Sequence, residues 1–175
     1  MRPRHARLPT VFMMTDPRMG DGLWHALDRL PRGAGVIFRH HGVPGRRMLF
    51  DRVRRVARAR GLVLILAGSP AMARGWRADG VHGAAPGRTP LRTIAAHNAQ
   101  EIQRAGRMAA DLVLLSPLFA TRSHPGTRTL GRVRFGLLAR RSRVPVVALG
   151  GMDTVAARSL RGFGIHGWAG IDAFL

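Results

Sequence analysis

Eight short apolar segments alternate with longer amphipathic segments along this chain, and this alternation constrains the fold more than any other feature. The apolar segments predict strands at residues 10–16, 34–40, 62–68, 80–84, 92–98, 111–119, 144–151 and 167–175. Apolar residues at helical spacing predict helices at residues 20–30, 45–61, 70–78, 99–110, 132–143 and 153–164. Strands that alternate with helices are typical of a parallel sheet, and eight such units predict a closed (β/α)8 TIM barrel. An open, doubly wound sheet is the alternative.

The predicted barrel is compact, because the chain has 175 residues whereas this fold typically has about 250. The link between the fourth and fifth strands, residues 85–91, is too short and too rich in proline for a full helix. We expect a single barrel domain over residues 1–175, with residues 1–8 as a basic extension and no helix after the eighth strand. The outer face of that strand is then expected to be bare and apolar, which predicts association as a homodimer.

The formal net charge is +20, from 29 basic residues, all of them arginine, and 9 acidic residues. Such a chain attracts nucleic acid, anionic lipid or phosphorylated metabolites. Nucleic-acid binders usually interleave a basic stripe with stacking aromatics, whereas here aromatics are 6% and the arginines are spread along the chain. We therefore interpret the charge as mainly a solvated surface and expect any binding of nucleic acid to be non-specific.

Other sequence features exclude several classes of protein. No apolar run approaches the ~20 residues that a membrane span needs. The N-terminus is basic and lacks the apolar stretch of a signal peptide. Without cysteine the chain can form neither a disulfide framework nor a thiolate metal site. We expect a cytoplasmic protein with no membrane partner.

In a barrel of this kind the functional site lies at the carboxyl ends of the strands. Gly150 and Gly151 follow the seventh strand there, and glycine lets backbone N–H groups approach an anion closely. A predicted helix start at Asp153 adds a favourable dipole, so this turn predicts a phosphate site. The loop after the sixth strand brings hydroxyl and basic side chains over the same mouth. These are Thr121, Arg122, Ser123 and His124.

Histidines and acids at other strand ends have alternative interpretations. His97 either faces a ligand or simply precedes Asn98, which with Glu101 fits a capping box. His124 is either a phosphate contact or proton donor, or a solvated loop residue. Asp16 is either a functional acid at the mouth or a cap for the following loop.

Two blocks of the sequence resemble a known family. "DLVLLSPLFATRSHPGT" (111–127) and "VPVVALGGM" (144–152), with "MTDPR", "ADGVH" and "HNAQEI", resemble the thiamine phosphate synthase/TenI family. The likeness is greatest to its short synthase-like domains, some of them fused to Nudix hydrolases. The resemblance implies a (β/α)8 barrel and a transferase of thiamine biosynthesis. That transferase joins hydroxymethylpyrimidine pyrophosphate to a thiazole phosphate and releases pyrophosphate.

The resemblance also implies roles for individual residues. Gly150 and Gly151 match the turn that binds the thiazole phosphate, with Ala169 and Gly170 alongside. The pyrophosphate side corresponds to Arg39, Thr121, Ser123 and His124, and Arg122 of the same loop is a further substrate-binding candidate. Our candidate catalytic residues are Ser116, His97 and His124.

Several positions depart from the family pattern. Mg²⁺ is expected for the family, but the "NDR" segment that carries one of its ligands is Ala67-Gly68-Ser69 here. The second metal-binding acid is lost in "GVHGAAPG", so we predict no metal site and leave the cofactor unknown. The histidine of the tautomerase branch is Pro117.

Three hypotheses follow. The chain is a thiamine phosphate synthase-like enzyme, a non-catalytic or divergent protein that binds a phosphorylated thiamine precursor, or a non-specific nucleic-acid binder.

Overall fold

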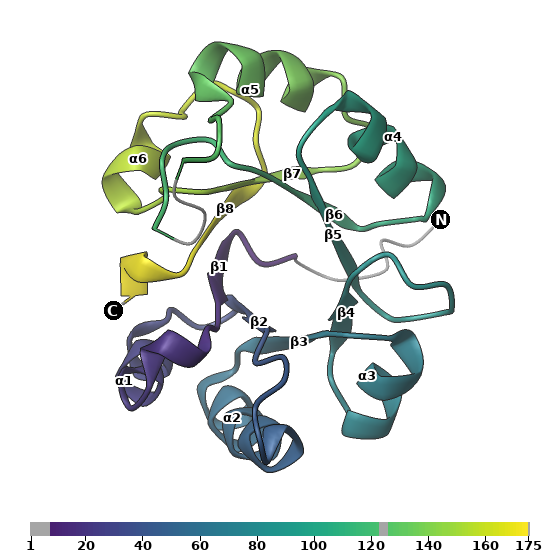
Figure 1. The fold of residues 1–175 in the computed structure, drawn as a ribbon, viewed down its shortest axis with the longest axis vertical. Helices are drawn as coiled ribbons and strands as arrows, with labels where there is room; N and C mark the ends of the chain where they lie inside the picture. The colour runs from purple at the N-terminus through teal and green to yellow at the C-terminus, as the bar shows by residue number, and fades with distance from the viewer. Residues whose placement is uncertain (1–7, 123–125, 175) are drawn as a thin grey trace.

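A computed structural model, which describes residues 8–122 and 126–174, shows eight parallel strands closed into one barrel (Figure 1). The strands are β1 (Val11–Met14), β2 (Gly35–Phe38), β3 (Val63–Ala67), β4 (Gly80–His82), β5 (Arg92–Ala96), β6 (Leu112–Leu115), β7 (Val146–Leu149) and β8 (Gly167–Gly170). Each strand pairs with its successor in sequence order, and β8 pairs with β1. The predicted (β/α)8 barrel is confirmed, and the open-sheet alternative is wrong.

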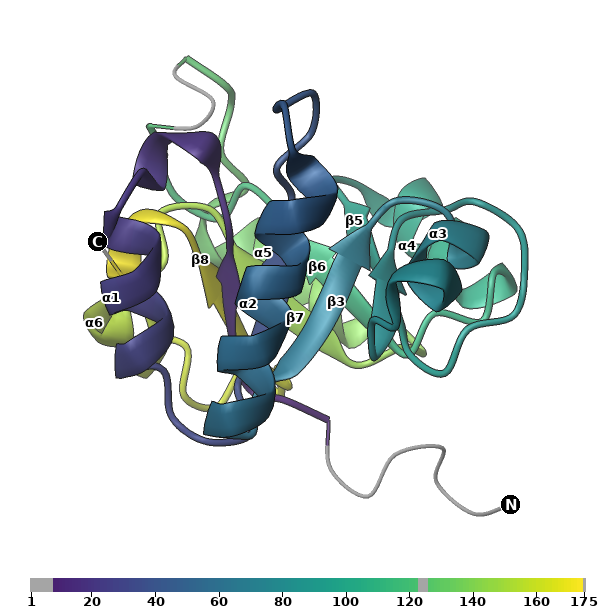
Figure 2. The same cartoon turned by 90° about the horizontal axis from the view of Figure 1, so that it is seen from below.

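The helices form an outer layer around the strands (Figure 2). They are α1 (Gly22–Arg29), α2 (Arg46–Arg60), α3 (Pro70–Trp76), α4 (Ala99–Arg107), α5 (Gly131–Arg140) and α6 (Thr154–Arg158), with 3-10 turns η1 (Pro17–Met19) and η2 (Asp172–Phe174). The capping box predicted from Asn98 and Glu101 is present: Asn98 Oδ1 accepts the Glu101 backbone N–H at 2.9 Å. As expected, β4 and β5 are joined without a helix.

Most elements are shorter than the sequence predicts, and α6 and β8 are among those that differ most. Helix α6 has five residues, and the chain after it turns through Gly162 and Gly164, whose φ angles of 87° and 68° end helical geometry. Strand β8 ends at Gly170 and is followed by η2 rather than running on through Phe174.

The outer face of β8 is not bare. The Phe174 ring, carried by η2, stacks on Trp168 with ring centroids 5.5 Å apart and planes 3° apart. This short turn therefore takes part of the place of the missing eighth helix, which weakens the sequence-based reason for expecting a homodimer.

Apolar side chains fill the barrel. Residues on alternate positions of the strands point inward and form one buried cluster that includes Phe12, Met14, Ile37, Ile65, Leu112, Leu114 and Val147. Toward the carboxyl ends the next inward position is polar on three of these strands, at Asp16, Arg39 and Ser116, so polar side chains lie at this end of the filled barrel. Among the described residues, none of the helices is long and apolar enough to cross a membrane.

Candidate active site

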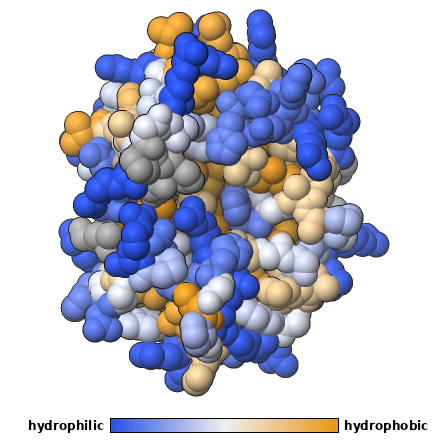
Figure 3. Space-filling model, viewed as in Figure 1, coloured by the Kyte–Doolittle hydropathy of each residue, from blue (hydrophilic) through white to orange (hydrophobic). Residues whose placement is uncertain are grey.

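A cavity of about 240 Å³ opens at the carboxyl ends of the strands. Figure 3 views the molecule from this end and shows both hydrophilic and hydrophobic residues around the centre. The cavity is lined by Arg39, His97, Ser116, Pro117, Ala120, Thr121, Arg122, Thr127, Leu149, Gly150, Gly151, Met152, Gly170, Ile171 and Asp172. Strands β2 and β5 to β8 and their loops thus all contribute.

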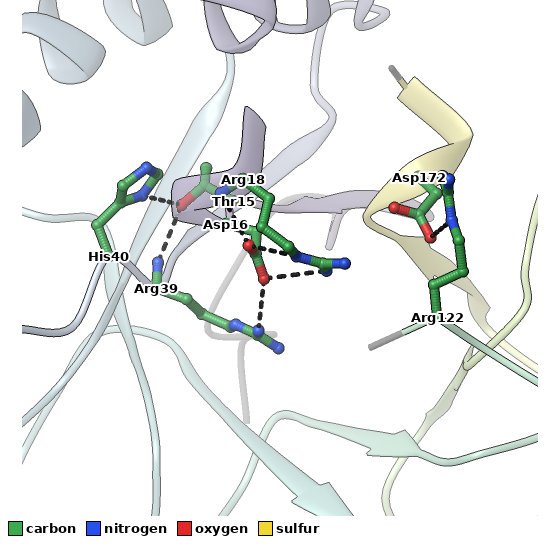
Figure 4. Close-up of polar contacts among 7 residues, drawn as sticks. All are labelled: Thr15, Asp16, Arg18, Arg39, His40, Arg122 and Asp172. Carbon is green, nitrogen blue, oxygen red and sulfur yellow. Dashed lines mark hydrogen bonds and ion pairs between the residues drawn. The ribbon is translucent and has the colours of Figure 1, made fainter. Parts of the chain in front are cut away.

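One side of the mouth is an ion cluster built on Asp16, which follows β1 (Figure 4). Asp16 Oδ1 lies 2.8 Å from Arg18 Nε, and Asp16 Oδ2 lies 3.4 Å from Arg39 Nη2. The carboxylate also caps η1 by accepting the Arg18 backbone N–H. The hydrogen bond from Arg18 outweighs burial and lowers the pKa of Asp16, so this acid stays ionised at neutral pH. The cap predicted at Asp16 is therefore confirmed, and its role as a functional acid stays a prediction.

Arg39 is held at the cavity by its backbone as well as by Asp16. Its backbone N–H donates to Thr15 Oγ1 at 3.0 Å, and that oxygen lies 2.8 Å from His40 Nδ1. Alternation along the strand turns the His40 ring outward, where it stacks on Phe38, while Arg39 turns toward the cavity. Burial lowers the pKa of Arg39, and its 3.4 Å contact with Asp16 is long for a charge-assisted hydrogen bond. This guanidinium is therefore only partly compensated and favours an anionic ligand.

The loop after β6 is joined to the end of β8 by a second ion pair. Arg122 Nε lies 3.2 Å from Asp172 Oδ2, and both residues line the cavity (Figure 4). Asp172 also raises the pKa of Arg18 through its charge, after the larger effect of Asp16. Charged groups from β1, β2, the β6–α5 loop and β8 thus alternate in sign along this side of the mouth.

His97 and Ser116 form the polar contact between β5 and β6. His97 Nδ1 lies 2.9 Å from the Ser116 carbonyl oxygen and 3.3 Å from Ser116 Oγ. Because a carbonyl can only accept, Nδ1 carries the proton, and Nε2 of the neutral ring is the free acceptor. His97 in this tautomer does not take a proton from Ser116 through Nδ1, so the pair is not arranged as a nucleophilic dyad.

The Gly150–Gly151 turn packs closely against the loop that follows β6. Both residues have left-handed φ angles, 95° and 61°. A Cβ on Gly151 would collide with the Ala120 carbonyl oxygen and lie 2.8 Å from Phe119 Cβ. Neither backbone N–H donates a hydrogen bond within residues 8–122 and 126–174, which leaves both available at the cavity wall.

The helix that follows this turn adds less than the sequence predicts. Helix α6 is short, and the Asp153 carboxylate already accepts the Ala156 backbone N–H at 2.7 Å. A capping carboxylate offsets the positive end of the helix dipole. Attraction for a phosphate must then come mainly from the arginines and the two glycine N–H groups.

The two strand ends where the family resemblance expects Mg²⁺ ligands do not fit a divalent cation. After β3, Ser69 caps α3, and the Arg46 guanidinium donates to the Ala67 carbonyl at 2.7 Å. After β4, the buried Arg92 guanidinium donates to the carbonyls of Gly83, Ala85 and Gly87. Guanidinium groups thus already bind carbonyl oxygens in both segments, and no group of three metal-ligating side chains occurs among the described residues.

Most of the candidate site residues come together at this cavity. It is lined by Arg39, His97, Ser116, Thr121, Arg122, Gly150, Gly151 and Gly170. Ala169 does not line it, because its side chain is fully buried in the barrel interior. Ser123 and His124 lie outside the described residues.

Sequence reasoning missed two charged residues of the mouth. Arg18 belongs to the "MTDPR" segment, but only the fold brings it beside Asp172. Asp172 follows directly on the last strand, and its position at a strand end is the signal that could have found it. The partly buried His82, at the end of β4, has a hydrogen-bond partner within the barrel: its Nδ1 lies 2.8 Å from Thr93 Oγ1.

Comparison with known proteins identifies the family. The sequence profile described as thiamine monophosphate synthase matches residues 34–174. The chain belongs to the thiamine monophosphate synthase family. This confirms the resemblance seen in the sequence.

Individual relatives agree with this membership. A protein of Aquifex aeolicus (strain VF5), named "Putative thiamine-phosphate synthase 2", is 26% identical over 183 residues, covering 96% of this chain and 98% of the relative. The thiamine phosphate pyrophosphorylase of Pyrococcus furiosus has a similar structure, with a TM-score of 0.75, 21% identity and coverage of 95% of this chain and 86% of the other. A 2-keto-3-deoxy-6-phosphogluconate aldolase of Zymomonas mobilis has a TM-score of 0.64 at 15% identity, covering 94% and 81% of the two chains. At these identities the two structural matches show the barrel fold alone.

Proposed function

We propose that this family member binds phosphorylated thiamine precursors at the strand-end cavity and joins hydroxymethylpyrimidine pyrophosphate to thiazole phosphate. The observation that carries the proposal is the partly compensated Arg39 guanidinium, which lines the same cavity as the Gly150–Gly151 turn. Two separated sets of donors suit two phosphorylated substrates bound side by side.

The pyrophosphate is assigned to the basic side of the cavity. Arg39, Thr121 and Arg122 supply guanidinium and hydroxyl groups there. Ser123 and His124, beyond the described residues, extend this set by their place in the same loop. Guanidinium groups bind phosphate oxygens in bidentate fashion, which suits a ligand with several negative oxygens.

The thiazole phosphate is assigned to the glycine turn. The backbone N–H groups of Gly150 and Gly151 have no other acceptor among the described residues, and Gly170 lies beside them on the cavity wall. Ala169, next to Gly170 in the chain, is fully buried, so its side chain does not line the cavity.

In the proposed reaction, the carbon–oxygen bond at the pyrimidine methylene breaks and its electron pair leaves with the pyrophosphate. The new bond forms between that methylene carbon and the thiazole. Negative charge grows on the departing group, and the positive charge of Arg39 and Arg122 stabilises it in the transition state. His97, whose Nδ1 contacts the Ser116 carbonyl oxygen, forms with Ser116 a polar part of the cavity wall.

Binding without turnover is the second candidate function, and two observations favour it. The segments where the family carries metal-binding acids are occupied by Arg46 and Arg92. The cavity of about 240 Å³ is also smaller than the roughly 300–1,000 Å³ of common small-molecule sites. One phosphorylated precursor fits such a volume more readily than two substrates do.

A turnover assay with both substrates, with Mg²⁺ and with EDTA, separates these functions. Release of pyrophosphate in step with consumption of thiazole phosphate supports the enzyme. Calorimetric binding of either precursor without release of pyrophosphate supports the binding protein. If neither precursor binds and no pyrophosphate is released, both functions are refuted. A single domain over the whole chain, a cytoplasmic location and a homodimer stay predictions.

A further inference from the structure

A second hollow lies at the opposite end of the barrel from the mouth. It has a volume of about 640 Å³ and is lined by Ile102, Gln103, Gly106, Arg107, Arg141, Arg143 and Val144. These residues come from α4 and from the segment that joins α5 to β7. Because the helices run antiparallel to the strands, the end of α4 and the start of β7 meet at the amino-terminal end of the barrel. We call this hollow the α4–β7 groove, and it shares no residue with the mouth cavity.

Three guanidinium groups line the α4–β7 groove. Arg107, Arg141 and Arg143 are exposed, and none of their guanidinium groups makes a hydrogen bond or ion pair in the described part of the chain. The negative ends of the α4 and α5 dipoles favour Arg107 and Arg141. That effect does not explain Arg143, which follows the helix, nor why three like charges line one hollow. A bound anion would remove their mutual repulsion.

The groove also offers an apolar surface beside these charges. Ile102 and Val144 are buried as residues yet contribute to the lining, and Gly106 leaves the space between them open. A Cβ on Gly106 would meet only Val144 Cγ2, at 3.9 Å, so packing does not require glycine there. The Gln103 amide adds one hydrogen-bonding group at the edge.

We propose that the α4–β7 groove binds a nucleoside di- or triphosphate. The three guanidinium groups match the charge of a polyphosphate and hold its oxygens. The ring lies on the apolar strip of Ile102, Gly106 and Val144, beside the Gln103 amide. Inorganic phosphate would use the arginines and leave this strip empty. The proposal concerns a site separate from the mouth and does not depend on the proposed function.

Calorimetric titration of the full chain with ADP, at low and at moderate salt, tests this site. The variant Arg107→Gln/Arg141→Gln/Arg143→Gln is expected to bind ADP at least about tenfold more weakly, because it removes all three charge-assisted contacts. The matched control is Arg29→Gln/Arg58→Gln/Arg158→Gln. Its arginines are also exposed and lie in the last turns of helices, so it removes the same charge from elsewhere. This control is expected to change ADP binding less than about threefold at moderate salt, where long-range charge is screened.

Gly106→Leu tests the apolar strip while keeping every charge. Leucine favours a helix more than glycine, so the variant is expected to fold, as circular dichroism checks. It should weaken ADP at least about fivefold, because the side chain fills the space assigned to the ring. Equal loss in both triple variants would show diffuse charge and overturn the site. Loss of ADP binding in Arg39→Gln with retention in the groove variant would move ADP to the mouth. The proposal would also be refuted if ADP does not bind. It would be refuted equally if pyrophosphate binds as tightly as ADP and Gly106→Leu leaves the affinity for ADP unchanged.

Discussion

Replacement of Arg39 by glutamine is expected to weaken pyrophosphate binding more than any other single change at the mouth. Arg39 lines the cavity, and its only acceptor among the described residues is the long contact to Asp16. The substitution should not disturb the fold. Asp16 keeps its 2.8 Å bond to Arg18, and the backbone bond from residue 39 to Thr15 does not involve the side chain.

The size of the effect follows from the position of Arg39. A unit charge on a phosphate about 4 Å from a guanidinium gains ~4 kcal/mol at an effective dielectric constant of ~20. The Arg39 side chain is 27% exposed and faces the Asp16 carboxylate, so solvent and Asp16 both reduce this value. Hydrogen bonds to charged groups contribute a net ~1.5–3 kcal/mol. We expect a loss of about 2 kcal/mol, which is about a 30-fold weaker Kd.

Calorimetric titration with pyrophosphate and with thiazole phosphate measures this loss. Arg134→Gln is the control, since it removes an equal charge from an exposed position on α5 outside the cavity. Thiazole phosphate, assigned to the glycine turn, should be affected less than pyrophosphate. A change below about twofold in pyrophosphate affinity, or an equal change in the control, would refute the assignment of Arg39.

Three further predictions follow from the structure. Thiazole phosphate should bind equally well with EDTA and with Mg²⁺, as calorimetry can show, because guanidinium groups occupy the oxygens after β3 and β4; a dependence on Mg²⁺ would contradict this. Burial lowers the pKa of His82 to about 4, so the unfolded chain binds the proton first and stability should fall as pH drops from about 6.5 to about 4. Denaturant titrations across this range should show a flatter profile for His82→Gln, and an unchanged profile would exclude His82 as the source. Asn98→Ala removes the α4 cap and should cost about 1 kcal/mol, or a Tm lower by about 2–4 °C in thermal melts; an unchanged Tm would show that the cap is not needed.

The alternation of apolar and amphipathic segments predicted the strands and helices of a parallel barrel, because hydrophobic periodicity decides which face of each segment is buried. The pairing of β8 with β1 then excluded the open sheet. The same pattern located the mouth, since the carboxyl ends of parallel strands meet at one end of a barrel. Glycine and capping signals were equally local: the Asn98–Glu101 box is visible in the sequence and present in the structure. Lengths were less certain, and α6 is shorter than predicted because turns through Gly162 and Gly164 follow it.

Charge pairing was decided by the tertiary structure alone. The sequence shows Asp16, Arg39 and Asp172 at three strand ends but not which cation each acid contacts. The distances depend on loop paths and side-chain directions that local patterns do not encode. Arg92 shows the difference most clearly: in the sequence it is one arginine among 29 basic residues. In the fold it is 5% exposed and binds the carbonyls of the β4–β5 loop. Sequence periodicity fixes burial one segment at a time, whereas ion pairs and carbonyl contacts join segments that only the closed barrel brings together.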